Sequence, residues 1–289
     1  MPTPVALSRD NAQTCFDKDA RPALEVAPGT IVAFETGDET YARLAAGESL
    51  AEIGMANVNR VTGPVAVAGA EPGDVLSIEV LDIRIERAWT AWMPDVGALG
   101  HWVDTAAVRE LRRRDDGMLV VNETIAVPLR PSIGCIGVAP ASAPGSTMSP
   151  AGPWGGNMDL RELAPGATLL LPVQVDGALL SLGDLHAAMG AGEPTGAGYE
   201  AAGVATVRLD VVRGLDLPFP RIRTAGATIC VGMDETHPMA RRRAMEQAHR
   251  LLVERGLEPL DAYAYASAEV ELRLGGPASA IVLAVVRFP

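Results

Sequence analysis

Residues that can bind a metal ion gather between Pro153 and Glu200. The side chains that we single out there as possible ligands of a cation are Asp159, Asp184, His186, Glu193 and Glu200. Because Asp184 and His186 are separated by a single residue, they project from the same side of an extended segment. We therefore interpret Asp184 and His186 as a pair of ligands for one ion.

Two apolar runs in the same stretch indicate the strands that position these side chains. The first run covers Ala167–Val175, the second covers Leu179–Leu182, and a glycine-containing turn separates them. Short apolar runs bounded by glycine are typical of buried strands. We predict that the two strands pair, and that the second one leads into Gly183-Asp184-Leu185-His186.

The whole chain has the composition of a globular protein built mainly from short strands. It has 289 residues, 48% of them hydrophobic, and its 30 glycines and 22 prolines are spread along the sequence. This length suits one large domain or two moderate ones. We predict a single unit over residues 1–289, with possible sub-domains at 1–150, rich in strands, and 151–289, rich in strands and ending with a helix.

Periodicity sharpens this picture at two places. Val75–Ile85 alternates apolar and polar residues and predicts a half-buried strand with a register shift near Leu81. His237–Arg255 has one apolar face and predicts a helix, with Thr236 as N-cap and Gly256 as the stop. The expected fold is mainly β with an α+β C-terminal portion, and its domains resemble β-sandwiches or barrels.

Charge and cysteine content limit the partners and the compartment. The net charge of −12 disfavours binding to nucleic acid, whose phosphates repel an acidic surface. Cys15, Cys135 and Cys230 are far apart and have no metal-type spacing, which indicates free thiols in a reducing compartment. No basic leader and no apolar run of about 18 residues is present, so we expect a cytoplasmic protein that does not span a membrane.

Several segments of the chain resemble the acetamidase/formamidase family. The matching segments are GGNMDL at 155–160, LPVQVDGALLSLGDLHAAMGAGE at 171–193, Glu200, Phe34-Glu35-Thr36, Thr62–Val65, Gly69–Leu76 and Ile136–Pro140. The resemblance spans most of residues 30–270 and is most specific at GDLHAAMGAGE. It implies a cytoplasmic homodimer or higher homo-oligomer of β-rich, sandwich-like fold. The activity it implies is hydrolysis of short aliphatic amides, mainly formamide and acetamide, and its acidic and histidine site implies zinc or calcium.

Amide hydrolysis needs an activated water, and a metal or a carboxylate is the economical way to provide it. The sequence has no Gly-x-Ser-x-Gly motif for a serine nucleophile. We expect Asp184 and His186 to bind the metal, with Glu35 or Glu200 completing the set of ligands. This donor set suits zinc, and additional carboxylates would tolerate calcium or manganese.

The remaining polar groups of the stretch are candidates for the other catalytic roles. Glu193, which lies in a glycine-rich loop, is the candidate general base and proton shuttle. Gly155, Gly156 and Asn157 offer N–H groups that could bind an oxyanion, and Asp159 is a candidate to orient Asn157.

Two other functions fit the same residues. One is a non-catalytic β-sandwich module whose acidic loops bind calcium structurally, and the other is an amidase for a larger or cyclic amide. The tryptophan-rich loop 88–102 bears on the choice of substrate, because it could cap the pocket or contact another subunit. We expect Trp92 to be part of a cap.

Overall fold

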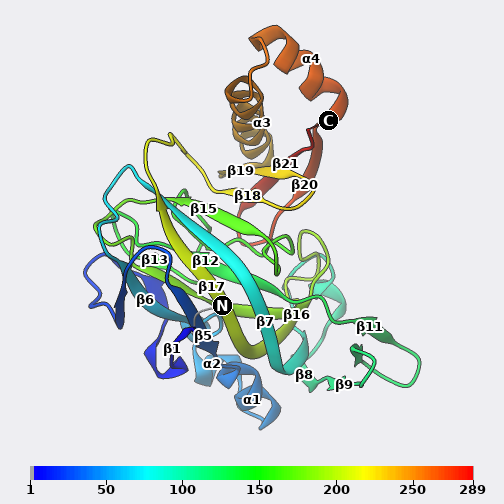
Figure 1. The fold of residues 1–289 in the computed structure, drawn as a ribbon. Helices are drawn as coiled ribbons and strands as arrows, with labels where there is room; N and C mark the ends of the chain where they lie inside the picture. Colours follow the sequence, from blue (N-terminus) through cyan, green and yellow to red (C-terminus); the bar gives the residue numbers. More distant parts are fainter. Residues whose placement is uncertain (1–2, 289) are drawn as a thin grey trace.

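Strands dominate the protein, which we describe from a computed structural model over residues 3–288. Figure 1 shows β7 and β17 crossing the molecule side by side, with α3 and α4 grouped beside β18–β21 at one end. The prediction of a mainly β fold with a helical C-terminal portion is confirmed.

The strands form one large sheet network and two smaller sheets, and four helices and three 3₁₀ turns accompany them. The large network comprises β1 (Val5–Leu7), β2 (Ala12–Gln13), β4 (Leu24–Val26), β5 (Ile31–Thr36), β6 (Val61–Val67), β7 (Val75–Trp92), β8 (Ala107–Glu110), β12 (Ser132–Gly137), β14 (Gly155–Asn157), β15 (Thr168–Pro172), β16 (Leu180–Ala188), β17 (Tyr199–Val212), β18 (Arg221–Arg223), β19 (Thr228–Asp234), β20 (Glu271–Leu274) and β21 (Ala280–Val286). The smaller sheets are β9 (Arg112–Arg113), β10 (Met118–Val120) and β11 (Ala126–Pro128), and β3 (Cys15–Phe16) with β13 (Gly145–Ser146). The helices are α1 (Glu39–Ala45), α2 (Leu50–Ile53), α3 (His237–Glu254) and α4 (Pro259–Glu269), with 3₁₀ turns η1 (Arg9–Asn11), η2 (Met55–Asn57) and η3 (Gly100–Trp102).

The strand predicted over Val75–Ile85 is the start of the longer strand β7. It pairs with β17 along its length, and Thr206 lies opposite Asp82 while Val207 lies opposite Val80. Leu81 is thus the extra residue of a β-bulge, as the apolar pattern predicts. Strands from both sides of residue 150 pair here.

The predicted pairing of the two apolar runs is wrong. The run at Ala167–Val175 forms β15, which pairs with β7 and β18, whereas the second run forms β16, which pairs with β6, β12 and β17. Ala178 and Leu179, which lie between them, have φ values of 60° and 56°. These left-handed residues turn the chain out of a simple hairpin and send each strand to a different neighbour.

The C-terminal helix confirms its prediction. α3 begins after Thr236, whose side chain accepts a hydrogen bond from the N–H of Met239, and Gly256 follows its end with a φ of 98°. Its alanine-rich face packs on β19, and a second buried apolar cluster forms between α3, α4 and β21. Within residues 3–288, no helix is both long enough and apolar enough to cross a membrane.

Candidate functional site

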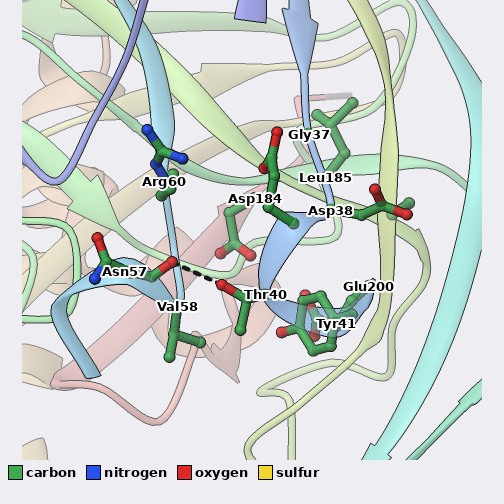
Figure 2. A pocket seen from close by; sticks show the side chains of 12 residues that line it. Gly37, Asp38, Thr40, Tyr41, Asn57, Val58, Arg60, Asp184, Leu185 and Glu200 are labelled. Atoms are coloured by element: carbon green, nitrogen blue, oxygen red, sulfur yellow. Dashed lines mark hydrogen bonds between the residues drawn. The ribbon is translucent and has the colours of Figure 1, made fainter. Parts of the chain in front are cut away.

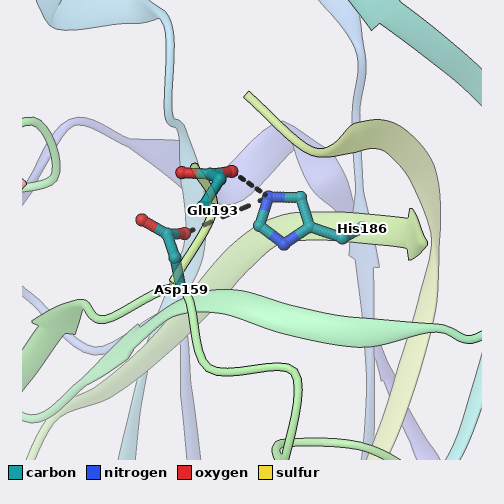
Figure 3. A group of neighbouring side chains, drawn as sticks. All are labelled: Asp159, His186 and Glu193. Carbon is teal, nitrogen blue, oxygen red and sulfur yellow. Dashed lines mark ion pairs between the residues drawn. The ribbon is translucent and has the colours of Figure 1, made fainter. Parts of the chain in front are cut away.

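Four carboxylates surround the imidazole of His186. Its Nε2 lies 3.4 Å from Glu193 Oε1 and 3.5 Å from Glu200 Oε2. The same nitrogen lies 4.0 Å from Oδ1 of both Asp159 and Asp184. Figure 3 shows Asp159 and Glu193 directed at the ring from one side. The structure therefore gathers the five residues that the sequence analysis singled out in the 153–200 stretch.

Strand pairing positions the centre of this cluster. His186 on β16 lies directly opposite Glu200 on β17, and Asp184 precedes His186 on the same strand. Asp159 follows β14, and Glu193 lies in the loop between β16 and β17. β16, β17 and the loop between them thus supply four of the five residues of the cluster.

Three of the four carboxylates lie at unusual backbone positions. Asp159, Asp184 and Glu193 have φ values of 48°, 54° and 38°. Such conformations are unfavourable for residues other than glycine and typically persist at functional sites. The local strain is consistent with side chains directed to one point rather than with ordinary strand alternation.

Gly134 on β12 lies beneath the cluster, and no motif in the sequence predicts its role there. A Cβ atom at Gly134 would come within 2.6 Å of His186 Cε1, 2.7 Å of Asp184 Oδ2 and 2.8 Å of Asp159 Oδ1. Only glycine leaves room for these three side chains. A Cβ at Gly198 would likewise come within 2.9 Å of the His186 ring.

Burial makes these carboxylates costly to ionise. It raises the pKa of Asp159 to about 7 and the pKa of Glu193, which Asp159 raises further, to about 10. Burial and the charge of Glu200 raise the pKa of Asp184 well above its usual value. Without a cation, part of the cluster must therefore hold protons.

His186 and Glu200 form the charged pair at the centre. Burial lowers the pKa of His186, but Glu200 and the other carboxylates outweigh burial and raise it well above its usual value. Burial raises the pKa of Glu200, but His186 and the N–H of Gly198, 2.7 Å from Oε1, bring it below its usual value.

The cluster fits a divalent cation. Within residues 3–288, Asp159–His186–Glu193 and Asp184–His186–Glu200 each offer three ligand atoms within 4.8 Å of one another. Asp159 Oδ1 is buried and has no hydrogen-bond partner in the described part of the chain. Carboxylate oxygens with one imidazole nitrogen are a donor set that zinc, manganese and calcium sites use.

Glu35 is not part of this cluster. It lies on β5, where its neighbours Phe34 and Thr36 are the buried residues, and its charge helps to raise the pKa of Arg9. Glu35 is absent from the two groups of possible ligands gathered around His186 within residues 3–288. Of the two alternatives, Glu200 is the residue that lies at the site.

The two glycines predicted to bind an oxyanion have a packing role instead. The N–H of Gly155 already donates to the Gly152 carbonyl oxygen at 2.9 Å. A Cβ at Gly155 would come within 2.4 Å of the Ile136 carbonyl oxygen, and one at Gly156 within 2.7 Å of the Trp154 ring. Neither glycine lines a cavity beside the cluster. We therefore do not include Gly155 and Gly156 in the proposed mechanism below.

Asn157 does line the cavity beside the cluster. Its Oδ1 accepts a hydrogen bond from Nδ2 of Asn59 at 3.2 Å. Asn59, rather than Asp159, therefore orients Asn157, which corrects the expected role of Asp159. Asn59 stands outside any motif, and sequence reasoning did not find it.

A cavity of about 380 Å³ opens in front of the cluster. The 93–97 segment lines it through Met93 and Val96, whereas Trp92 and Trp102 do not line it. Trp102 is 74% exposed, and Trp89 is buried with its Nε1 donating to Asp38 at 2.7 Å. The tryptophan-rich loop thus borders the cavity, but its tryptophan rings are not the cap.

A second, small cavity of about 20 Å³ lies behind Asp184 and Glu200. It has room for about one water. Figure 2 shows Thr40 beside it, with its hydroxyl donating to the Asn57 carbonyl oxygen at 2.8 Å.

Tyr41 on α1 lines both cavities. Burial and the nearby carboxylates, Glu200 foremost, raise its pKa well above the usual value and keep its hydroxyl protonated. The segment ETYARLA carries no recognisable motif, so the position of Tyr41 at the site could not be predicted from the sequence.

Comparisons with known proteins agree with this geometry. The family profile described as Acetamidase/Formamidase family matches residues 4–143 and 90–284. The crystal structure of an acetamidase from Bacillus halodurans is 33% identical, with a TM-score of 0.91, and the match covers 98% of this chain and 97% of that one. A predicted acetamidase/formamidase from Thermoanaerobacter tengcongensis is 31% identical, with a TM-score of 0.91, covering 98% and 95%.

Curated relatives match more weakly. A formamidase from Methylophilus methylotrophus is 23% identical over 247 residues, which cover 65% of this chain and 61% of that protein. The matches span between 55% and 64% of the length of the three curated relatives. The profile and the structures nevertheless cover nearly all of the chain, and its fold is acetamidase-like. This chain therefore belongs to the acetamidase/formamidase family.

Proposed function

We propose that this protein hydrolyses short aliphatic amides of the formamide and acetamide type. The observation that carries the proposal is the buried cluster of one histidine and four carboxylates at the end of a cavity. The balanced reaction is an amide plus water giving a carboxylate and ammonium. Membership of the family supports the amide as the substrate.

Asp184, His186 and Glu200 are the proposed metal ligands, with Asp159 and Glu193 on the other side of the same imidazole. Zinc is our first assignment because the set includes an imidazole nitrogen, and calcium is the alternative because oxygen donors dominate. A divalent cation in such a site makes water more acidic and polarises a carbonyl oxygen.

The protein's own groups then position the substrate and move the proton. Glu193 is the proposed base: it takes a proton from water and delivers it to the departing amine. Asn157, fixed by Asn59, donates to the amide oxygen, on which negative charge develops. The Tyr41 hydroxyl, held protonated beside Glu200, is a second donor at the buried end.

Ammonia release tests this function directly. We expect the protein to release ammonia from formamide or acetamide, to lose this activity on treatment with a chelator, and to regain it with added zinc. Elemental analysis of the native protein should show bound metal. A protein that binds calcium but releases no ammonia from any amide would be the structural calcium module instead.

We further propose that the protein is a cytoplasmic homo-oligomer. The free thiols of Cys15, Cys135 and Cys230 support a reducing compartment. Exposed apolar side chains on α4, Leu260 at 84% and Tyr263 at 69% exposed, support a subunit contact. Light scattering of the native protein measures the oligomeric state.

A further inference from the structure

The cavity in front of the cluster is larger than the smallest amides require. Its volume is about 380 Å³. Acetamide has four non-hydrogen atoms and needs on the order of 100 Å³, since a water occupies about 30 Å³ of liquid. A volume in this range is typical of pockets for much larger ligands, which begin at about 300 Å³. Most of the space would be left to water if acetamide were the substrate.

The walls away from the cluster are apolar and come from separate segments. Met55 and Val58 come from η2 and the residue after it, Met93 and Val96 follow β7, and Met148 comes from the loop before β14. Methionine side chains are flexible and adapt to irregular apolar ligands. Apart from Asp95, the polar side chains of the lining belong to the cluster and to Tyr41, Asn59 and Asn157. The cavity therefore has a polar end for the reacting amide and an apolar end for a substituent.

The charges of the cavity exclude an anionic substituent. Within the described residues that line it, the charged or titratable side chains are Asp95, Asp159, Asp184, His186, Glu193 and Glu200, with no lysine or arginine. A carboxylate or phosphate on the substrate would lack a cationic partner and would face like charges. The substituent is therefore not an anion, and the methionine and valine walls favour an apolar group.

We propose that the preferred substrate is a primary amide whose acyl group is uncharged, apolar and several carbons longer than acetyl. The acyl chain lies against Met93, Met148 and Val58, while the carboxamide lies at the His186 cluster. This inference rests on the proposed amide hydrolysis and specifies its substrate class. In this proposal the apolar wall residues determine which acyl group is preferred. The groups that carry out the hydrolysis are the same as in the proposed function.

A series of straight-chain primary amides tests the proposal on the native protein. We expect kcat/KM for ammonia release to rise from acetamide through butanamide to hexanamide, by roughly fourfold per methylene that is fully buried. Straight-chain alcohols are a second probe that needs no turnover of the probe itself. Hexanol should inhibit acetamide hydrolysis competitively, at a concentration at least tenfold lower than ethanol.

Cavity-filling variants locate the acyl chain. Met93→Trp and Met148→Trp should each lower the hexanamide-to-acetamide ratio of kcat/KM at least tenfold. Met239→Phe is the matched control, because Met239 is exposed on α3 and outside the cavity, and it should leave the ratio unchanged. Circular dichroism identifies a variant that fails to fold, and the alcohol series on the unmodified protein decides in that case.

The outcomes separate this inference from the proposed function. Efficient release of ammonia from acetamide, with kcat/KM falling for longer chains and no preference for hexanol, overturns the substrate class and leaves amide hydrolysis standing. Release of ammonia from no amide of the series overturns the proposed function and this inference with it. If kcat/KM rises with acyl chain length in the native protein and no longer rises in the two tryptophan variants, the apolar wall is the acyl site.

Discussion

At the scale of single residues, the site is a problem of charge in a buried space. In the described part of the chain, His186 is the only cationic partner of the four carboxylates of the cluster. These groups are buried: His186 is 1% exposed, Glu193 is 5% exposed and Glu200 is 3% exposed. Ionising all of these groups without a further cation is costly in a low-dielectric environment. A bound dication would offset part of this negative charge, so removal of any one ligand should weaken metal binding.

Removing a ligand should remove metal and activity together. We expect Asp184→Asn and His186→Ala each to lower the bound metal, measured by elemental analysis, and to lower ammonia release in proportion. The fold should survive, with unchanged circular dichroism, because the strand pairing of β16 does not depend on these side chains. Full metal content in both variants would rule out the assignment of these ligands.

Replacing the proposed base should separate chemistry from metal binding. Glu193→Gln keeps the shape of the side chain but cannot accept the proton, so kcat should fall by roughly 10²–10⁴ while the metal content changes little. Kinetics and elemental analysis on the same preparation give both values. Near-normal turnover would place the base elsewhere, with Glu200 as the next candidate.

Gly134 offers a test of how tightly the cluster is packed. Gly134→Ala places a Cβ against His186, Asp184 and Asp159, so metal affinity should fall by roughly 10–100-fold although no ligand is changed. Gly190→Ala is the matched control, because its nearest contact would be an ordinary 3.6 Å to Pro194. Equal metal affinities for the two variants, measured by competition with a chromophoric chelator, would contradict the packing argument.

At the scale of elements, strands carry the chemistry and irregular segments form the cavity wall. β16 presents Asp184 and His186, and β17 presents Glu200 opposite. The η2 turn and the segment after β7 provide the apolar residues. Rigid strands hold reacting groups well, whereas loops change easily without disturbing the core.

The helix α3 lies very close to β19, and this contact is testable. A Cβ at Gly232 would come within 2.1 Å of the Ala240 carbonyl oxygen and 2.4 Å of the Ala244 nitrogen. Gly232→Ala should therefore lower the free energy of unfolding by about 1–3 kcal/mol through overpacking. Gly226→Ala, where a Cβ meets nothing within 4 Å, should change it by at most about 0.5 kcal/mol in urea unfolding.

At the scale of the whole molecule, the cluster connects several strands and a loop of the 153–200 stretch with Gly134 on β12. Asp159, Asp184, Glu193 and Glu200 come from three strand regions and one loop, and Gly134 on β12 lies beneath them. A cation bound here would connect all of these segments in the folded state only. Metal binding should therefore stabilise the entire fold by mass action.

Metal removal should be visible in the melting temperature. With free metal at a hundred times its dissociation constant, stabilisation is about 2.7 kcal/mol, so chelation should lower Tm by several degrees. Differential scanning calorimetry of native, chelated and re-metallated protein measures this. In His186→Ala the chelator should have little further effect, and an identical Tm drop in that variant would locate the metal elsewhere.

The sequence by itself determined the local structure and the reactive residues. Apolar periodicity and capping residues predicted the start of α3 after Thr236, and apolar alternation predicted the bulge of β7 at Leu81. Each of these signals is contained within a few consecutive residues. The side chains Asp184, His186 and Glu200 were identifiable because few residue types bind cations and these lie beside glycine-rich turns. The resemblance at GDLHAAMGAGE identified the family for the same reason: its motif is contiguous.

Only the tertiary structure decided which distant segments meet. β15 and β16 do not pair although they are neighbours in sequence, since each finds a longer partner, β7 or β17, far along the chain. Glu35 lies outside the cluster, whereas Tyr41 and Gly134 lie at the site because of close packing, which no local pattern encodes. The size of the cavity likewise depends on many separate segments meeting, because a volume is a property of packed surfaces and not of any one stretch of sequence.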